Sequence, residues 1–143
     1  MIANLALGTL LISTTVVIHT FGLMAVTYAM GALTSRIRQH GRRSRIVAMI
    51  AAVIGIFVVL TLEIWLWAAM HLALGVVEDF ETALYFSTVT FSTVGYGDIM
   101  PKAEWRLFAA LEGVSGFLLI GWSTAYLVAA GIRVGPFRAG EHF

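Results

Sequence analysis

The residues with the clearest chemistry form one run, Thr93-Val94-Gly95-Tyr96-Gly97, which Asp98 follows. Glycine adopts positive φ without a steric penalty, so Gly95 and Gly97 allow successive backbone carbonyls to face the same way. Such carbonyls, repeated around an axis by several chains, can replace the water shell of a dehydrated cation. The motif therefore predicts ion coordination by the backbone rather than catalysis by a side chain.

The side chains of this motif have separate expected roles. Thr93 adds a hydroxyl group at the inner end of the carbonyl row. Val94 and Tyr96 are expected to turn away from the ion and to pack into surrounding protein, which would hold the diameter of the ring. The plain alternative is a glycine-rich turn between two helices.

The elements that must position this motif belong in a lipid bilayer. The chain of 143 residues is 59% hydrophobic and 12% charged, and its mean hydropathy is +0.90. This balance leaves too little polar surface to cover a soluble globule. The chain has no cysteine, which excludes disulfides, thiolate metal sites and cysteine nucleophiles.

Three apolar stretches, at about 2–33, 46–74 and 105–132, are each long enough to cross a membrane, which takes roughly 20 helical residues. The segment between the second and third stretches contains an apolar run at about 80–91 that is too short to span. Such a piece is tolerated in a membrane only where protein or water surrounds it, so it should enter from one face and return to the same face. The predicted fold class is an all-α membrane protein with three transmembrane helices and a re-entrant helix.

The charges predict the orientation of these spans. Seven of the nine basic residues fall at one end of the spans, namely Arg36, Arg38, Arg42, Arg43, Arg45, Arg133 and Arg138. Five of the eight acidic residues fall at the other end, namely Glu78, Asp79, Glu81, Asp98 and Glu104. Basic loops stay in the cytoplasm, so 36–45 is predicted to be a basic cytoplasmic loop, 133–143 a short cytoplasmic tail, and the N-terminus external.

The motif and its flanking residues, Ala83-Leu-Tyr-Phe-Ser87 before it and Gly97-Asp-Ile-Met-Pro101 after it, resemble the pore domain of the potassium-channel superfamily. The resemblance covers about 46–132 and implies an outer helix, a pore helix, a selectivity filter and an inner helix, with 1–35 as an extra N-terminal transmembrane helix. It implies a small prokaryotic subunit in an inner or plasma membrane that forms a homotetramer. K⁺ would bind at Thr93, Val94, Gly95, Tyr96 and Gly97, here called the filter segment. No cofactor and no nucleic-acid partner are expected.

The resemblance also assigns roles along the inner helix. Gly116 falls at the family's hinge position. Four residues fall at positions that line the central cavity and the inner gate, namely Phe117, Ile120, Thr124 and Val128. Their spacing of three, four and four residues places them on one face of a helix, although ordinary packing stripes have the same spacing. The glycines at 113, 116 and 121 fit close packing between membrane helices equally well.

Support for the filter segment is expected from three residues. Val89 stands where some family members have a buried glutamate, so Tyr85 is expected to bond Asp98 instead. Glu63 and Glu112 lie inside the spans at depths that look comparable. At least one of them, with Glu112 favoured, is predicted to accept hydrogen bonds from the short helix behind the filter segment. The alternative is that each acid merely satisfies a backbone or tryptophan donor.

Competing functions remain open at this point. His19 lies in mid-span and is interpreted as a neutral hydrogen-bonding packing residue rather than a proton sensor. An integral-membrane enzyme built on Glu63, His71 or Glu112 is disfavoured because the sequence has no metalloprotease, serine-elbow or phosphate-loop motif. The closer alternatives are a non-selective cation channel and a modulatory subunit that assembles without conducting.

Overall fold

A computed structural model describes residues 1–36 and 42–134. All regular structure in these residues is helical, which confirms the predicted all-α class. The elements in chain order are α1 (Ile2–Arg36), α2 (Arg42–Ala73), α3 (Phe80–Phe91), the 3-10 turn η1 (Ala103–Trp105) and α4 (Arg106–Val134). Three of the helices contain segments long and apolar enough to cross a membrane, at Ile2–Leu33, Arg43–Ala73 and Ala103–Arg133. The three predicted spans are therefore confirmed.

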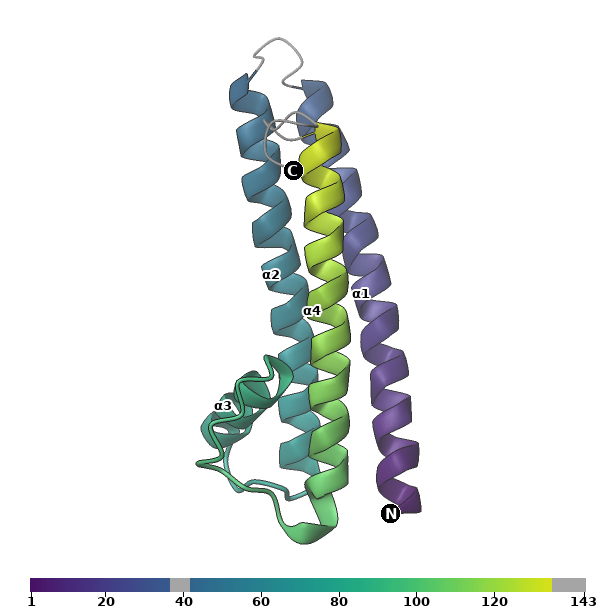
Figure 1. Cartoon of the computed structure of the whole chain (residues 1–143), viewed down its shortest axis with the longest axis vertical. Coiled ribbons are helices and arrows are strands. Elements are labelled where there is room, and N and C mark those ends of the chain that lie inside the picture. Colours follow the sequence, from purple (N-terminus) through teal and green to yellow (C-terminus); the bar gives the residue numbers. More distant parts are fainter. Residues whose placement is uncertain (37–41, 135–143) are drawn as a thin grey trace.

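The long helices form a bundle in which α1 and α4 run parallel and α2 runs in the opposite direction (Figure 1). Side-chain contacts of α1 with α4, and with η1 just before it, join residues about one hundred positions apart along the length of the bundle. Asn4 Nδ2 donates to the carbonyl oxygen of Glu104, and the hydroxyl groups of Thr27 and Tyr126 lie 2.8 Å apart. The two helices therefore keep one register from end to end.

The short helix α3 lies beside α2 and α4 at the end of the bundle where α4 begins (Figure 1). Its bounds agree with the predicted run at 80–91. The Asp79 carboxylate caps its first turn by accepting from Thr82 N at 2.9 Å and Thr82 Oγ1 at 2.6 Å. At 1.5 Å per residue the helix is only about 18 Å long, which is well short of the hydrocarbon core of a bilayer.

One apolar core joins the four helices. Its buried residues are Leu11, Trp67, Phe91, Phe108 and Leu119. Trp67 lies near the end of its span, where tryptophan often sits at the membrane interface, but its side chain is fully buried against Phe108, with ring centroids 5.2 Å apart. Trp65, two positions earlier, is half exposed, because adjacent helical residues face different directions.

The contact of α1 with α2 depends on glycine. A Cβ atom at Gly22 would lie 2.5 Å from Val59 Cγ2, and one at Gly55 would lie 2.7 Å from Val26 Cγ2. Small residues at these positions let the two helix backbones approach closely, as is common between membrane helices.

The structure moves one predicted boundary. Helix α2 begins at Arg42, so Arg42, Arg43 and Arg45 belong to its first turn, whereas the sequence places them in a loop at 36–45. Arginine has high helix propensity, which lets the helix extend into this basic stretch. Residues 37–41, with Arg38, and most of the predicted tail at 133–143, with Arg138, lie outside the described residues.

Candidate functional site

The filter segment leaves the C-terminus of α3 with an unusual backbone. Thr93 has φ of 60°, Gly95 of 56° and Gly97 of 74°, so every second residue is left-handed. The positive φ values predicted for Gly95 and Gly97 are confirmed. The value for Thr93 was not predicted, and it is uncommon for a residue that carries a branched Cβ.

Hydrogen bonds attach the start of the filter segment to the end of α3. Val94 N and Gly95 N both donate to the carbonyl oxygen of Val89 at 3.1 Å, and Thr93 N donates to that of Thr90 at 3.0 Å. The last carbonyl groups of a helix have no hydrogen-bond donor within the helix, so N–H groups of the following chain donate to them. The left-handed turn at Thr93 bends the chain back far enough to make these bonds.

The far end of the filter segment is attached to α3 by a side chain. Tyr85 Oη donates to Asp98 Oδ2 at 2.6 Å, and Ile99 N donates to Asp98 Oδ1 at 3.1 Å. The expected bond between Tyr85 and Asp98 is therefore present. The hydrogen bond from Tyr85 lowers the pKa of Asp98 below its ordinary value, so this acid stays ionised in neutral solution.

A pocket of about 250 Å³ separates α3 from the filter segment. Tyr85, Val89 and Thr90 line it on the helix side, and Gly95 and Gly97 line it on the other side. The side chains of Val94 and Tyr96 are 54% and 72% exposed in the single chain. The single chain therefore does not provide the packing predicted around these two residues.

The predicted pore-lining residues share the exposed side of α4. Phe117, Thr124 and Val128 are exposed and Ile120 is half-buried. The side chains of α4 that hydrogen-bond with α1 are Ser115, Ser123 and Tyr126. At about 100° per residue the two sets fall on opposite sides of the helix. The face with the predicted cavity residues therefore points away from α1.

Gly116 makes the closest approach between α4 and α3. A Cβ atom at this position would lie 1.9 Å from the carbonyl oxygen of Phe91, the last residue of α3. At Gly113 the nearest atom would be 3.6 Å away, and at Gly121 nothing lies within 4 Å. Of the three glycines, only Gly116 is therefore required by close packing, the alternative that the sequence left open. The role of Gly116 as a hinge stays a prediction.

Glu112 is fully buried, but its partner differs from the expected one. Glu112 Oε2 lies 2.6 Å from His71 Nε2 of α2. Ser87 of α3 is also buried and lies within reach of the Glu112 carboxyl group, although its hydroxyl group makes no hydrogen bond of regular geometry among the described residues. The His71 ring also packs edge-to-face on Phe86 of α3, with centroids 5.0 Å apart. The short hydrogen bond to Glu112 therefore comes from α2, which was not predicted, while α3 contributes Ser87 beside the carboxyl group and the Phe86 ring beside His71.

Glu63 forms a second buried pair at a different depth. Its Oε1 lies 3.0 Å from His19 Nδ1 of α1, and both side chains are fully buried. The partner of Glu112, His71, stands eight residues further along α2, which is about 12 Å at 1.5 Å per residue. The prediction of comparable depths for Glu63 and Glu112 is therefore wrong. The sequence held one signal for these pairs, since the spans contain two histidines and two glutamates.

A comparison with known families decides what this arrangement belongs to. Residues 57–133, more than half of the chain, match a family model described as "Ion channel". This chain belongs to that ion channel family. The match begins within α2 and includes α3, the filter segment and nearly all of α4. Helix α1 lies outside it.

Two potassium channels resemble part of this chain. The voltage-gated potassium channel Kch of Escherichia coli is 40% identical over 73 residues, which are 48% of this chain and 18% of the relative. The calcium-gated potassium channel TvoK of Thermoplasma volcanium is 36% identical over 66 residues, 46% of this chain and 19% of the relative. The predicted resemblance to the potassium-channel pore domain is thereby confirmed. The aligned region is under a fifth of each relative's length. No solved structure matches the chain.

Proposed function

We propose that this channel conducts K⁺ selectively through a pore formed by four copies of the chain. The observation that carries the proposal is the alternation of left-handed residues at Thr93, Gly95 and Gly97. Such alternation allows consecutive carbonyl groups of the filter segment to face a common axis. Rings of these carbonyls then replace the hydration shell of K⁺, and the Thr93 hydroxyl adds one more ring.

A single filter segment cannot enclose an ion, so several chains must contribute. The exposed side chains of Val94 and Tyr96 support assembly, because large apolar side chains that a single chain leaves exposed favour burial against neighbouring chains. The named relatives are potassium channels, which supports K⁺ as the permeant ion.

The exposed face of α4 would line the central cavity beneath the filter segment. In this arrangement Phe117 and Ile120 lie nearest the filter segment, and Thr124 and Val128 lie nearer the cytoplasm. The C-terminus of α3 carries the negative end of the helix dipole, which favours a cation in the cavity. Gly116 would serve both as a contact with Phe91 and as the place where α4 bends.

The arginines favour an orientation with the N-terminus outside and the connection between α1 and α2 in the cytoplasm. Arg43 is an exposed residue of the first turn of α2 and offers a labelling site. An impermeant maleimide should label Arg43→Cys only from the cytoplasmic side, and labelling from outside would overturn the orientation.

The proposal is tested by K⁺ flux from liposomes containing the Gly95→Ala variant. Alanine at the left-handed position 95 costs about 1–2 kcal/mol in each chain, repeated in every subunit, so selective flux should be lost. Gly31→Ala is the matched control, because Gly31 lies in a regular helix and its added methyl group would meet nothing within 4 Å. Normal K⁺ flux through Gly95→Ala would show that another part of the chain conducts.

A further inference from the structure

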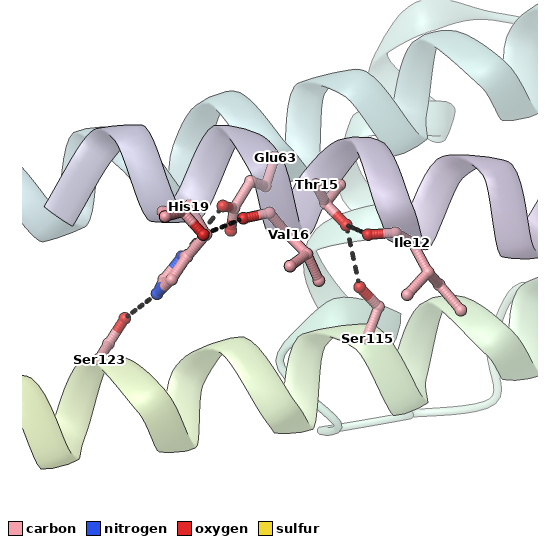
Figure 2. Close-up of polar contacts among 8 residues, drawn as sticks. Ile12, Thr15, Val16, His19, Glu63, Ser115 and Ser123 are labelled. Carbon is pink, nitrogen blue, oxygen red and sulfur yellow. Dashed lines mark hydrogen bonds and ion pairs between the residues drawn. The ribbon is translucent and has the colours of Figure 1, made fainter. Parts of the chain in front are cut away.

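Helix α1 is joined to the channel module by buried polar side chains, although it lies outside the family match. Thr15 Oγ1 lies 3.3 Å from Ser115 Oγ. One turn further, the His19 ring stands between two other helices (Figure 2). Its Nδ1 lies 3.0 Å from Glu63 of α2, and its Nε2 lies 3.4 Å from Ser123 Oγ of α4.

This cluster is costly in a membrane. His19 and Glu63 are fully buried near the middle of their spans, and Ser123 is 4% exposed. An apolar contact such as that of Gly22 with Val59 suffices to pack α1 on the bundle, so packing alone does not require an acid and a base. Ionisable residues at this depth are rare and mark functional sites by default.

The proton count of the cluster controls its charge. A neutral imidazole carries one N–H proton. When a second proton is shared between the imidazole and the carboxyl group, the cluster as a whole is neutral. Loss of that proton leaves a buried carboxylate beside a neutral ring, and an uncompensated buried charge is unfavourable. The Ser123 hydroxyl also changes role, because it accepts a bond from a protonated Nε2 and donates a bond to an unprotonated one.

No other titratable group contacts the cluster among the described residues. Helix α2 presents only Glu63, while α4 presents Ser123 and the Trp122 ring, whose centroid lies 5.3 Å from that of His19. Tyr126, which bonds Thr27, follows Ser123 by about one turn of α4, and His71, which pairs with Glu112, lies about 12 Å from Glu63 along α2. A proton gained or lost here is therefore not neutralised by a neighbour.

Ser123 places the cluster directly behind the proposed pore. The next residue, Thr124, belongs to the face of α4 that would line the cavity, and both lie on the cytoplasmic side of Gly116 in the proposed orientation. We propose that His19, Glu63 and Ser123 form a proton-sensitive link through which α1 holds the inner part of α4 and thereby controls opening. This inference rests on the proposed function. It gives α1 a role as a built-in regulatory partner of the channel module.

The first test measures K⁺ flux against pH in liposomes with the same pH on both sides. The full-length channel should show a pH-dependent step in flux, and Glu63→Gln, which keeps an acceptor oxygen but cannot titrate, should lose this step. Ser123→Ala should reduce the size of the step, because the link to α4 is cut. Thr14→Val is the control, since the Thr14 hydroxyl is exposed and bonds only its own helix at Leu10. A pH profile of Glu63→Gln that matches the unmodified channel would overturn the proposal.

The second test does not require conduction. The chain has no cysteine, so Thr15→Cys with Ser115→Cys introduces the only thiols, at positions whose oxygens lie 3.3 Å apart. A disulfide should form within each chain. We expect the link to release as pH rises, so the rate of disulfide formation should fall relative to the rate in the same double-cysteine protein carrying Glu63→Gln. The two proteins have the same thiol chemistry, so the comparison removes the direct effect of pH on thiolate reactivity. If the rate of disulfide formation depends on pH in the same way with Glu63 and with Glu63→Gln, the proton-sensitive link is refuted. If cross-linking behaves as expected but the unmodified channel passes no K⁺, only the proposed function is refuted.

Discussion

The phenol of Tyr85 in α3 donates a 2.6 Å hydrogen bond to Asp98, the residue that directly follows the filter segment. The start of the filter segment is held by backbone bonds to Val89 and Thr90, so both ends are attached to the same helix. Twelve residues of α3 thus support the whole filter segment within one chain. Any movement of α3 is transmitted to the proposed ion pathway.

The bond from Tyr85 predicts a specific response to acid. The bond lowers the pKa of Asp98. The stabilisation that it gives the folded protein is therefore fully present above the ordinary aspartate pKa and is lost as pH falls through the lowered pKa. In Tyr85→Phe this contribution is absent and Asp98 protonates at a higher pH. Current through oriented channels should therefore decline at a higher external pH than in the unmodified channel. Tyr28→Phe, at an exposed tyrosine of α1, is the control, and identical acid titrations of Tyr85→Phe and this control would contradict the account.

Gly116 and Gly113 offer a matched pair on α4. Alanine at 116 would place its methyl carbon 1.9 Å from a backbone oxygen of α3, whereas alanine at 113 would make an ordinary contact at 3.6 Å. Overpacking typically costs about 1–3 kcal/mol, and a backbone neighbour yields less easily than a side chain. Gly116→Ala should therefore lower the thermal stability of the purified channel clearly more than Gly113→Ala does. If both variants melt like the unmodified protein and only gating changes, Gly116 is a hinge without a packing role.

The pair of His71 with Glu112 predicts strong coupling between two substitutions. Removing one member of a buried ion pair typically costs about 3–5 kcal/mol, because the other member is left without a partner. His71→Leu and Glu112→Leu should each destabilise the channel, and the double variant should be far more stable than the sum of the two losses implies. Denaturation of the four proteins in one detergent measures this cycle. Additive losses would mean that the two side chains do not interact.

Exposed acids near the external mouth should concentrate cations there. Glu78 and Glu81 are both exposed, whereas Asp79 also caps α3 and must be left unchanged. Replacing Glu78 and Glu81 by glutamine should lower K⁺ conductance in 10 mM salt, where the Debye length is about 30 Å. In 1 M salt, where that length is about 3 Å, the same variant should conduct like the unmodified channel. An equal loss of conductance at both salt concentrations would rule out an electrostatic effect.

The parts of the fold that depend on local sequence could be predicted. The bounds of α3 follow from Asp79 at its start and from the apolar run behind it, and the left-handed glycines follow from the motif itself. The bond from Tyr85 to Asp98 joins residues only 13 positions apart, and both belong to the sequence pattern of the family, so it could be predicted.

The parts that depend on how helices rotate against each other could not be predicted. The spans are apolar on nearly every side, so no polar stripe marks which face is buried. For this reason the sequence did not indicate that Glu112 pairs with His71 of α2. The link from His19 to Glu63 and Ser123 depends on the register of three helices, and residues 44 and 104 positions apart carry no local signal of contact.

The reversal potential under a K⁺ gradient tests the central claim most directly. Purified channels in a planar bilayer would face a tenfold K⁺ gradient, with Na⁺ added to equalise ionic strength on the two sides. If the carbonyl groups of the filter segment select K⁺, the current should reverse close to the K⁺ equilibrium potential, about 59 mV for one charge and a tenfold ratio. A reversal near 0 mV would show that K⁺ and Na⁺ pass alike and would contradict a potassium-selective pore.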